Sequence, residues 1–195
     1  LNHYFRFRPK GYQFMPMFRR KKWDGYVYLF NMDSNRIYYG LIPEIKRFST
    51  DREYEIVDNT GDILKPISND EYFNFLTSFP CEYKLRDYQS LAVRHSIDKK
   101  RCVLLSPTAS GKSLIIYYLL RYYFPEKSLV IVPTLSLVSQ MYSDFEAYAK
   151  ADKTFEVENI VHKIFGGQEK KSDKPIIIST WQSLYELHKG FFSDF

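Results

Sequence analysis

Residues 106–113, Ser-Pro-Thr-Ala-Ser-Gly-Lys-Ser, have the residue types and spacing of a loop that binds phosphate. The apolar run 102–105 before them predicts a buried strand, and the apolar run 114–120 after them predicts a helix. A helix that begins directly after a tight loop points free N–H groups and the positive end of its dipole at an anion. In such a loop Lys112 would reach the β- and γ-phosphates of a nucleotide, and the Ser113 hydroxyl would ligate Mg²⁺. The alternative is a surface turn whose lysine is merely solvated.

The elements before residue 80 predict a small α+β domain. Pro16 and a polar turn at 31–35 punctuate this part of the chain, and Ser68 with Glu71 forms a capping box at the start of a helix. We expect extended segments at 12–15 and 54–57, a hairpin from 26–30 and 36–39, and helices through 41–48 and 68–76.

Residues 81–195 alternate between strands and helices, which predicts a parallel sheet with helices on both faces. The expected strands lie at 129–132, 160–165 and 176–178, and apolar residues at helical spacing follow the first of them, at positions 137, 141, 145 and 148. In such sheets ligands bind at the carboxyl ends of the strands. We therefore expect the loop, residues 133–134 and residues 180–182 to lie at one edge.

The positive charge is concentrated at the start of the chain. The net charge is +5, yet residues 1–50 alone hold 10 Lys or Arg against 3 Asp or Glu, a net charge of +7. This asymmetry indicates a polyanion as partner, with a solvated basic surface as the alternative. Arg19, Arg20, Lys21 and Lys22 are candidates for phosphate contacts, and the neighbouring Trp23 either stacks on a base or anchors the hairpin, the reading we favour.

Other classes of protein find little support in the sequence. The two cysteines, Cys81 and Cys102, and the four histidines show no spacing typical of a zinc site or a disulfide framework. The apolar runs are too short to cross a membrane, and the N-terminus has no apolar secretory core. We therefore expect a protein of a reducing, cytoplasmic compartment.

Several motifs in order resemble those of the superfamily 2 helicases and translocases. Residues 85–89 are similar to the adenine-reading motif of that superfamily, which implies that Arg86 and Gln89 contact the nucleotide. Residues 107–113 resemble its motif I. The usual phosphate-loop pattern has glycine at the position of Ser106, but motif I also lacks that glycine, so Ser106 does not weaken the resemblance. The resemblance implies that ATP and Mg²⁺ are the cofactors, that Lys112 and Ser113 serve catalysis, and that the loop contacts ATP through Pro107, Thr108, Ala109, Ser110, Gly111, Lys112 and Ser113.

Three later segments resemble motifs that contact the nucleic-acid backbone in that superfamily. Residues 132–140 resemble motif Ia, Gly166 and Gly167 resemble a small glycine turn, and residues 179–184 resemble motif Ic. The resemblance implies DNA contacts at Pro133, Thr134, Gln140, Gly166, Gly167, Thr180 and Gln182. Thr134 could also cap the helix after it, and for Trp181 we favour buried packing over stacking on a base.

The N-terminal part resembles the small domain that precedes the motor in phage UvsW-type recombination helicases. Residues 11–16, 22–25 and 39–41 carry this resemblance, which then extends over nearly the whole chain. It implies an α/β fold, with a DNA-binding domain at 1–80 followed by part of a first RecA-like P-loop lobe at 81–195. It also implies duplex, branched or single-stranded DNA as partner and, for a phage protein, the host bacterial cytoplasm. The oligomeric state is not predicted.

One part of a helicase motor is missing from the sequence. No Asp-Glu-x-His box, which would hold Mg²⁺ and orient the attacking water, follows the motif Ic segment. The resemblance thus implies the front part of an ATP-dependent DNA helicase that is inactive without the rest. Two alternatives stay open: the translocase subunit of a restriction system, and a DNA-binding P-loop module without catalysis.

Overall fold

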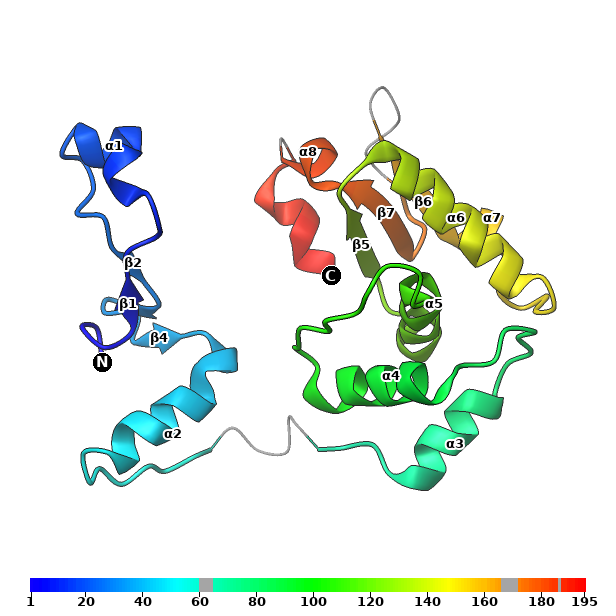
Figure 1. Cartoon of the computed structure of the whole chain (residues 1–195), viewed down its shortest axis with the longest axis horizontal. Helices are drawn as coiled ribbons and strands as arrows, with labels where there is room; N and C mark the ends of the chain where they lie inside the picture. The colour runs from blue at the N-terminus through cyan, green and yellow to red at the C-terminus, as the bar shows by residue number, and fades with distance from the viewer. Residues whose placement is uncertain (60–64, 166–171, 186) are drawn as a thin grey trace. The chain divides into compact units, whose positions relative to one another are not determined.

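The computed structural model describes residues 1–59, 65–165, 172–185 and 187–195. It divides into two compact units, Leu1–Gly61 and Asp62–Phe195, drawn in Figure 1. The described hydrophobic core clusters belong to the second unit, whereas Phe5 and Ser49 have the buried side chains described in the first.

The first unit is a small α+β fold built on two short antiparallel ladders. β1 (Arg6–Phe7) pairs with β2 (Val27–Tyr28), and β3 (Phe30–Asn31) pairs with β4 (Arg36–Ile37) around the expected turn. The hairpin is therefore confirmed, although its first arm is split between two ladders. The helical segments of this unit are η1 (Tyr12–Phe14), α1 (Pro16–Arg19), η2 (Tyr39–Leu41) and α2 (Ile42–Thr50).

Two predicted extended segments of this unit are wrong. Residues 12–15 form a 3-10 turn because Gly11 turns the chain at φ +78° and the Tyr12 ring then packs edge-on against Phe18 at 4.8 Å. Gly25 is required beside them, since a Cβ there would lie 2.6 Å from the Tyr12 ring. Residues 54–57 have apolar character but no ladder partner among the described residues, and they form no strand.

The boundary between the units differs from the one expected near residue 80. α3 (Asn69–Thr77) begins with the predicted capping box, in which Ser68 accepts from the Glu71 N–H and Glu71 accepts from the Ser68 N–H. Its Tyr72 side chain belongs to the core of the second unit, and Phe75 packs edge-on against Tyr122 at 5.1 Å. The capping box predicts the helix correctly but carries no information about which core the helix joins.

The second unit contains the predicted parallel sheet, in the order β5-β7-β6. β5 (Ser128–Val132) pairs with β7 (Ile176–Thr180), and β6 (Val161–Ile164) pairs with the other side of β7. In this register Val132 lies opposite Thr180. The segments that follow β5 and β7, which contain the residues that resemble motifs Ia and Ic, therefore leave the sheet next to each other.

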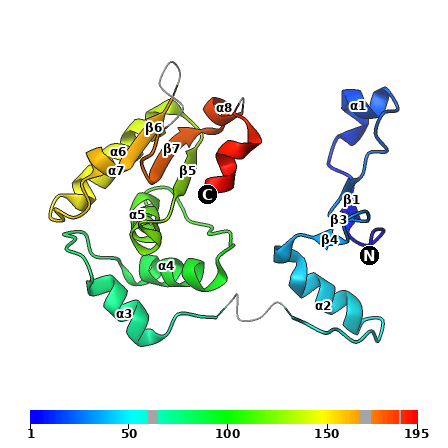
Figure 2. The same ribbon diagram turned by 180° about the vertical axis from the view of Figure 1, so that it is seen from behind.

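Helices cover both faces of this sheet, as predicted. One face packs through Ile176 and Ile178 against a core that includes α5 (Lys112–Tyr123) and α6 (Leu135–Ala149). The other face packs through Ile177 against Leu184 and Phe191. Figures 1 and 2 show α6 and the C-terminal helices on opposite sides of the strands. The remaining helices are α4 (Asp87–Lys99), α7 (Val157–Ile160), α8 (Trp181–Leu184) and η3 (Lys189–Asp194).

The buried strand predicted before the loop is not formed. Residues 102–105 form no regular secondary structure and have no ladder partner in the described part of the chain, and Val103 and Leu105 are 85% and 97% exposed. An interior strand needs a neighbour on each side, and β5 pairs only with β7 among the described strands. The apolar composition of these residues favours burial, but it does not specify which strand would pair with them.

Candidate functional site

The backbone of residues 111–113 presents successive unpaired N–H groups at the start of α5. Ala109 and Gly111 both adopt left-handed conformations, at φ +63° and +75°, and α5 begins at the next residue. Among the hydrogen bonds of the described residues, none uses the N–H groups of Gly111, Lys112 or Ser113 as donors. Successive N–H groups turned inward at a helix N-terminus bind anions, and phosphate most of all.

Two side-chain contacts close this loop upon itself. The Lys112 Nζ donates a hydrogen bond to the Pro107 carbonyl at 2.7 Å, so its ammonium lies over the loop while its side chain stays exposed. Ser106, which stands where many such loops have glycine, hydrogen-bonds through its hydroxyl to the hydroxyl of Ser110. The serine at position 106 thus adds a hydrogen bond across the loop, to Ser110.

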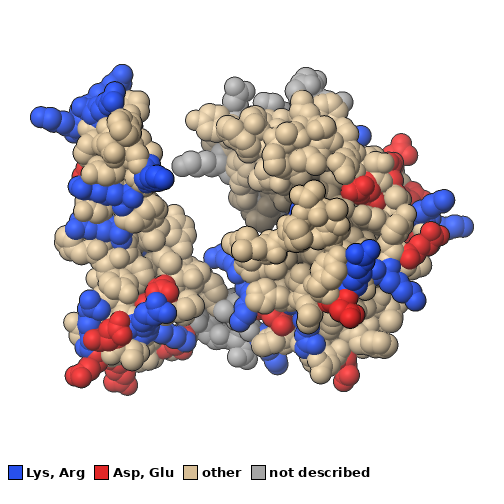
Figure 3. Space-filling model, in the orientation of Figure 1, with Lys and Arg blue, Asp and Glu red and all other residues tan. Residues whose placement is uncertain are grey.

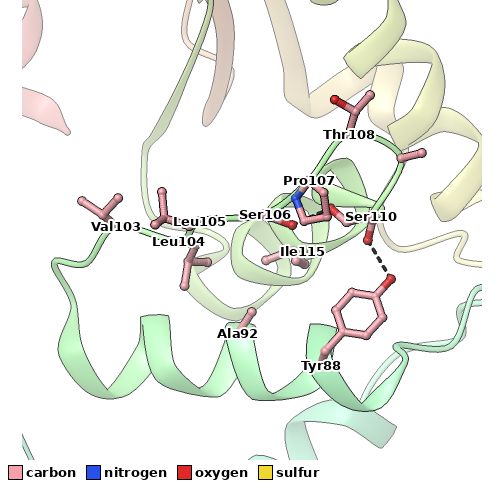
Figure 4. Close-up of a pocket in the computed structure, with 11 residues that line it drawn as sticks. Tyr88, Ala92, Val103, Leu104, Leu105, Ser106, Pro107, Thr108, Ser110 and Ile115 are labelled. Atoms are coloured by element: carbon pink, nitrogen blue, oxygen red, sulfur yellow. Dashed lines mark hydrogen bonds between the residues drawn. The ribbon is translucent and has the colours of Figure 1, made fainter.

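Side chains of helix α4 hydrogen-bond to the loop. Gln89 is only 4% exposed, and its amide accepts from the Arg86 N–H at 2.9 Å and donates to the Ser110 carbonyl at 2.9 Å. The Tyr88 hydroxyl donates to the same carbonyl at 3.0 Å, the contact drawn in Figure 4. A Cβ on Gly111 would lie 2.4 Å from the Gln89 Nε2. Gln89, predicted to read adenine, therefore also braces the phosphate loop, whereas Arg86 is exposed at the start of α4.

A cavity of about 560 Å³ lies between the loop, α4 and the unpaired segment before the loop. Figure 4 shows Leu104 and Ala92 facing each other across it, with Tyr88 and Ser110 at one end. No strand of the described chain fills this side of the loop. On this side the loop is held by hydrogen bonds from α4.

Ser113, the expected Mg²⁺ ligand, lies in the first turn of α5 and is partly buried. Its hydroxyl is 2.9 Å from the hydroxyl of Tyr148, in the last turn of α6. Sequence reasoning assigned Tyr148 to helix packing only, because a contact over 35 residues leaves no local pattern. Tyr88 was also missed as a contact, although it lies inside the motif that contains Arg86 and Gln89.

The two turns at the strand ends carry the other expected DNA-binding residues of this unit. Thr134 caps α6 by accepting from the Leu137 N–H at 3.4 Å. Thr180 caps α8 by accepting from the Ser183 N–H at 3.3 Å, and it is only 3% exposed, so it orders its turn while offering almost no surface to a ligand. The exposed members of the predicted set are Pro133, Thr134, Gln140 and Gln182. Gly166 and Gly167 lie outside the described residues.

Trp181 does not pack in the core, and the prediction of buried packing is wrong. It is 57% exposed, and its described ring contact is an edge-on approach to Tyr185 at 6.3 Å. Its backbone begins α8, so the buried Thr180 directs the next side chain outward. The apolar character of a tryptophan is compatible with either position, and the helix start decides between them.

The four basic residues predicted to contact DNA in the first unit are all exposed. Arg19 ends α1 and Arg20, Lys21 and Lys22 follow it, and Figure 3 shows Lys and Arg side chains gathered over this end of the unit. Arg19, Lys21 and Lys22 border a hollow of about 640 Å³ together with Trp23. The Trp23 Nε1 donates to the Tyr26 carbonyl at 2.7 Å, which fits the role of hairpin anchor.

A second group of cations in this unit was not anticipated. The guanidinium groups of Arg6 and Arg8 lie 4.2 and 4.3 Å from the ring centre of Tyr26. Alternate residues of an extended chain point to the same side, so the Arg-x-Arg spacing that begins in β1 and ends just after it could have shown this pairing. Nearby, the Tyr28 hydroxyl and the Tyr26 N–H donate to Asp24 and lower the pKa of its carboxyl group.

Other kinds of site are absent from the part of the chain that the structure describes. Within those residues, no three His, Cys, Asp or Glu side chains come close enough together to hold a metal ion. None of the helices described there has both the length and the apolar character needed to cross a membrane.

Comparison with known proteins matches both units. The family model for the res subunit of type III restriction enzymes matches residues 82–193, and the N-terminal model of the DNA helicase UvsW matches residues 1–58. The ATP-dependent DNA helicase uvsW of Enterobacteria phage T4 is 34% identical over 209 aligned residues, which span all of this chain and 40% of that relative. A DNA 3'-5' translocase, XPB2 of Sulfurisphaera tokodaii, is 27% identical over 73% of this chain and 28% of its own length.

The fold matches as well. A crystal structure of the UvsW helicase from bacteriophage T4 superposes with a TM-score of 0.82 at 31% identity, over all of this chain and 72% of that one. The chain thus spans less than half the length of the curated relatives that it matches. Its second unit is part of a RecA-like P-loop domain, preceded by a small α+β unit. The chain belongs to the superfamily 2 DNA helicases of the phage UvsW type.

Proposed function

We propose that this chain is the N-terminal part of an ATP-dependent DNA helicase or translocase that acts on branched recombination or replication intermediates. The observation that carries the proposal is the cradle at residues 109–113, with left-handed Ala109 and Gly111 and unpaired N–H groups where α5 begins. The family membership supports the choice of ATP as the ligand and of DNA as the substrate.

The chain's own residues have separate roles in holding the nucleotide. The N–H groups of the loop cradle the β-phosphate, and Lys112 moves from the Pro107 carbonyl to the β- and γ-phosphates, where it neutralises charge. Arg86, which is exposed at the start of α4, contacts the adenine, whereas the buried Gln89 acts through the loop that it braces at Ser110.

Mg²⁺ fits this site by the chemistry of its donors. Mg²⁺ prefers a few protein oxygens together with phosphate oxygens and water, and the Ser113 hydroxyl at the start of α5 supplies one such oxygen. When bound, the ion neutralises charge on the β- and γ-phosphate oxygens. Ser113 would hold the ion, and Lys112 would add a second positive charge at the phosphates.

The DNA contacts come from both units. Arg19, Arg20, Lys21 and Lys22 are exposed and bind backbone phosphates of duplex or branched DNA. In the second unit, Pro133, Thr134 and Gln182 lie where the adjacent ends of β5 and β7 leave the sheet, and they contact one strand. Thr180 acts indirectly, through the turn that it caps. We place this activity in the cytoplasm of a bacterial host, where a phage helicase meets its DNA.

A second candidate is the translocase subunit of a restriction system. The match of residues 82–193 to the res subunit of type III restriction enzymes favours it, whereas the match of residues 1–58 to the UvsW N-terminal domain favours the helicase. A nuclease motif elsewhere in the complete reading frame would decide for the restriction system. DNA binding without any response to ATP would instead indicate a module that has kept the loop without catalysis.

The test is DNA-stimulated ATP hydrolysis by the protein expressed from its complete reading frame. Lys112→Ala should abolish hydrolysis and weaken nucleotide binding, while Lys99→Ala, an exposed lysine at the end of α4, serves as the matched control. Residues 1–195 alone should bind nucleotide weakly and not hydrolyse it at a useful rate. Hydrolysis that survives Lys112→Ala unchanged would refute the proposal.

A further inference from the structure

The hydroxyl groups of Ser113 and Tyr148 form the described contact between the start of α5 and the end of α6. The two oxygens are 2.9 Å apart and partly buried, and either residue can be the donor. The two helices also pack against each other elsewhere, through Tyr117 and Phe145. Tyr148 is therefore the side chain that touches the residue expected to meet the metal ion.

The position of the Tyr148 hydroxyl is set by the rings around its own ring. Tyr83 approaches it edge-on at 5.0 Å, and Tyr117 approaches it at 5.5 Å. Burial raises the pKa of Tyr148, with Asp144 adding to the effect and the Ser113 hydrogen bond opposing it.

The chemistry of a hydroxyl ligand explains what this contact does. A serine oxygen that gives a lone pair to a cation still carries its hydrogen, and that hydrogen must point away from the cation toward an acceptor. The Tyr148 oxygen accepts hydrogen bonds and lies at the right distance. An oriented hydroxyl loses less freedom on binding the ion than one that rotates.

We propose that Tyr148 is a positioning residue, which orients the Ser113 hydroxyl for the Mg²⁺ that accompanies a bound nucleotide. The inference rests on the proposed function, because it requires Ser113 to be a ligand of that ion. Tyr148 touches neither the nucleotide nor the ion and acts through Ser113 alone.

The test measures how much Mg²⁺ the protein needs to bind a fluorescent ADP analogue, with the protein expressed from its complete reading frame. Tyr148→Phe keeps the ring and removes the acceptor, so the half-saturating Mg²⁺ concentration should rise about 2- to 12-fold, the effect of one hydrogen bond. Binding of the analogue in EDTA should be unchanged. Tyr142→Phe is the control, since it removes a phenol hydroxyl from the same helix without a described bond to the loop.

A double-mutant cycle with Ser113→Ala separates the possible results. If Tyr148 acts through Ser113, Tyr148→Phe has no further effect on the Mg²⁺ requirement once Ser113 is alanine. An equal effect in both backgrounds, or a lower requirement in Tyr148→Phe, overturns the inference. A normal requirement in Tyr148→Phe with a raised one in Ser113→Ala overturns it too, but leaves the proposed function intact. A normal requirement in Ser113→Ala overturns the role of Ser113 as a ligand of the ion, and with it the inference about Tyr148, whereas the proposed function is decided by Lys112→Ala.

Discussion

Replacing Gly111 by alanine should damage the phosphate loop, because the position is left-handed and closely packed against Gln89. Gly111 has φ +75°, and a Cβ built on it would lie 2.4 Å from the Gln89 Nε2. Gln89 cannot retreat freely, because it is buried and its amide holds both the Arg86 N–H and the Ser110 carbonyl. The substitution therefore combines backbone strain with the loss of a buried side chain's partners.

The magnitude follows from these two effects. A left-handed conformation costs about 1–2 kcal/mol for a residue with a Cβ. Displacing Gln89 removes two hydrogen bonds of about 1 kcal/mol each. The free energy of unfolding of the second unit should thus fall by about 3–4 kcal/mol, which moves a urea midpoint by about 1.5–2 M at a slope of about 2 kcal/mol per M. A cradle with one hydrogen bond fewer to the phosphate should bind nucleotide about 10- to 100-fold more weakly.

Urea unfolding and titration with a fluorescent ADP analogue measure the two effects. Gly40→Ala is the matched control, since a Cβ there meets nothing within 4 Å. Gln89→Ala should cost clearly less in the Gly111→Ala protein than in the unmodified one, because the same hydrogen bonds are lost only once. Wild-type stability and wild-type nucleotide affinity in Gly111→Ala would refute the role assigned to Gln89 in bracing the loop.

Three further perturbations test other parts of the structure. Asp152→Asn should lower the free energy of unfolding by about 3–5 kcal/mol, measured in urea, because it leaves the buried Arg121 guanidinium, 2.8 Å away, without its counter-charge; an unchanged midpoint would contradict this. Burial raises the pKa of Tyr117, whose hydroxyl has no hydrogen-bond partner in the described structure. The contribution of Tyr117 to stability is therefore complete below about pH 10 and declines above that value, where the unfolded chain ionises first. The free energy of unfolding that is lost between about pH 9 and about pH 11 should be smaller in Tyr117→Phe. Replacing the four basic residues 19–22 by alanine should lower the slope of log affinity against log salt by about 0.9 for each DNA phosphate that is no longer neutralised, measured by DNA anisotropy, whereas an unchanged slope would place the DNA elsewhere.

Elements with a strong local pattern could be predicted from the sequence. The capping box of Ser68 and Glu71 starts α3 as expected, and the apolar spacing that ends at Tyr148 lies within α6. The phosphate loop was found for the same reason, since its chemistry depends on neighbouring residues only. In each case the determinants lie within a few residues of one another, so that a single sequence contains them all.

Features that depend on distant partners could not be predicted. Residues 102–105 have the composition of a strand, but composition cannot say which strand would pair with them. Trp181 is exposed because α8 begins at that residue, and Tyr148 meets Ser113 across 35 residues. The division of the chain was misplaced in the same way, because the capping box of α3 says nothing of the core that Tyr72 joins.

The phosphate loop of this chain keeps its shape through the helices beside it. The segment before it has no described strand partner, yet Ala109 and Gly111 still adopt the left-handed conformations that turn the N–H groups inward. Gln89 on α4 holds the loop carbonyl at Ser110, and Tyr148 on α6 holds the hydroxyl of Ser113. Helices α4 and α6 thus hold the loop by hydrogen bonds, at Ser110 in its turn and at Ser113 where α5 begins. Thr134 caps the start of α6, next to the point where β5 leaves the sheet. The same helix therefore has a proposed DNA contact at its start and, at its end, the contact with the proposed metal ligand.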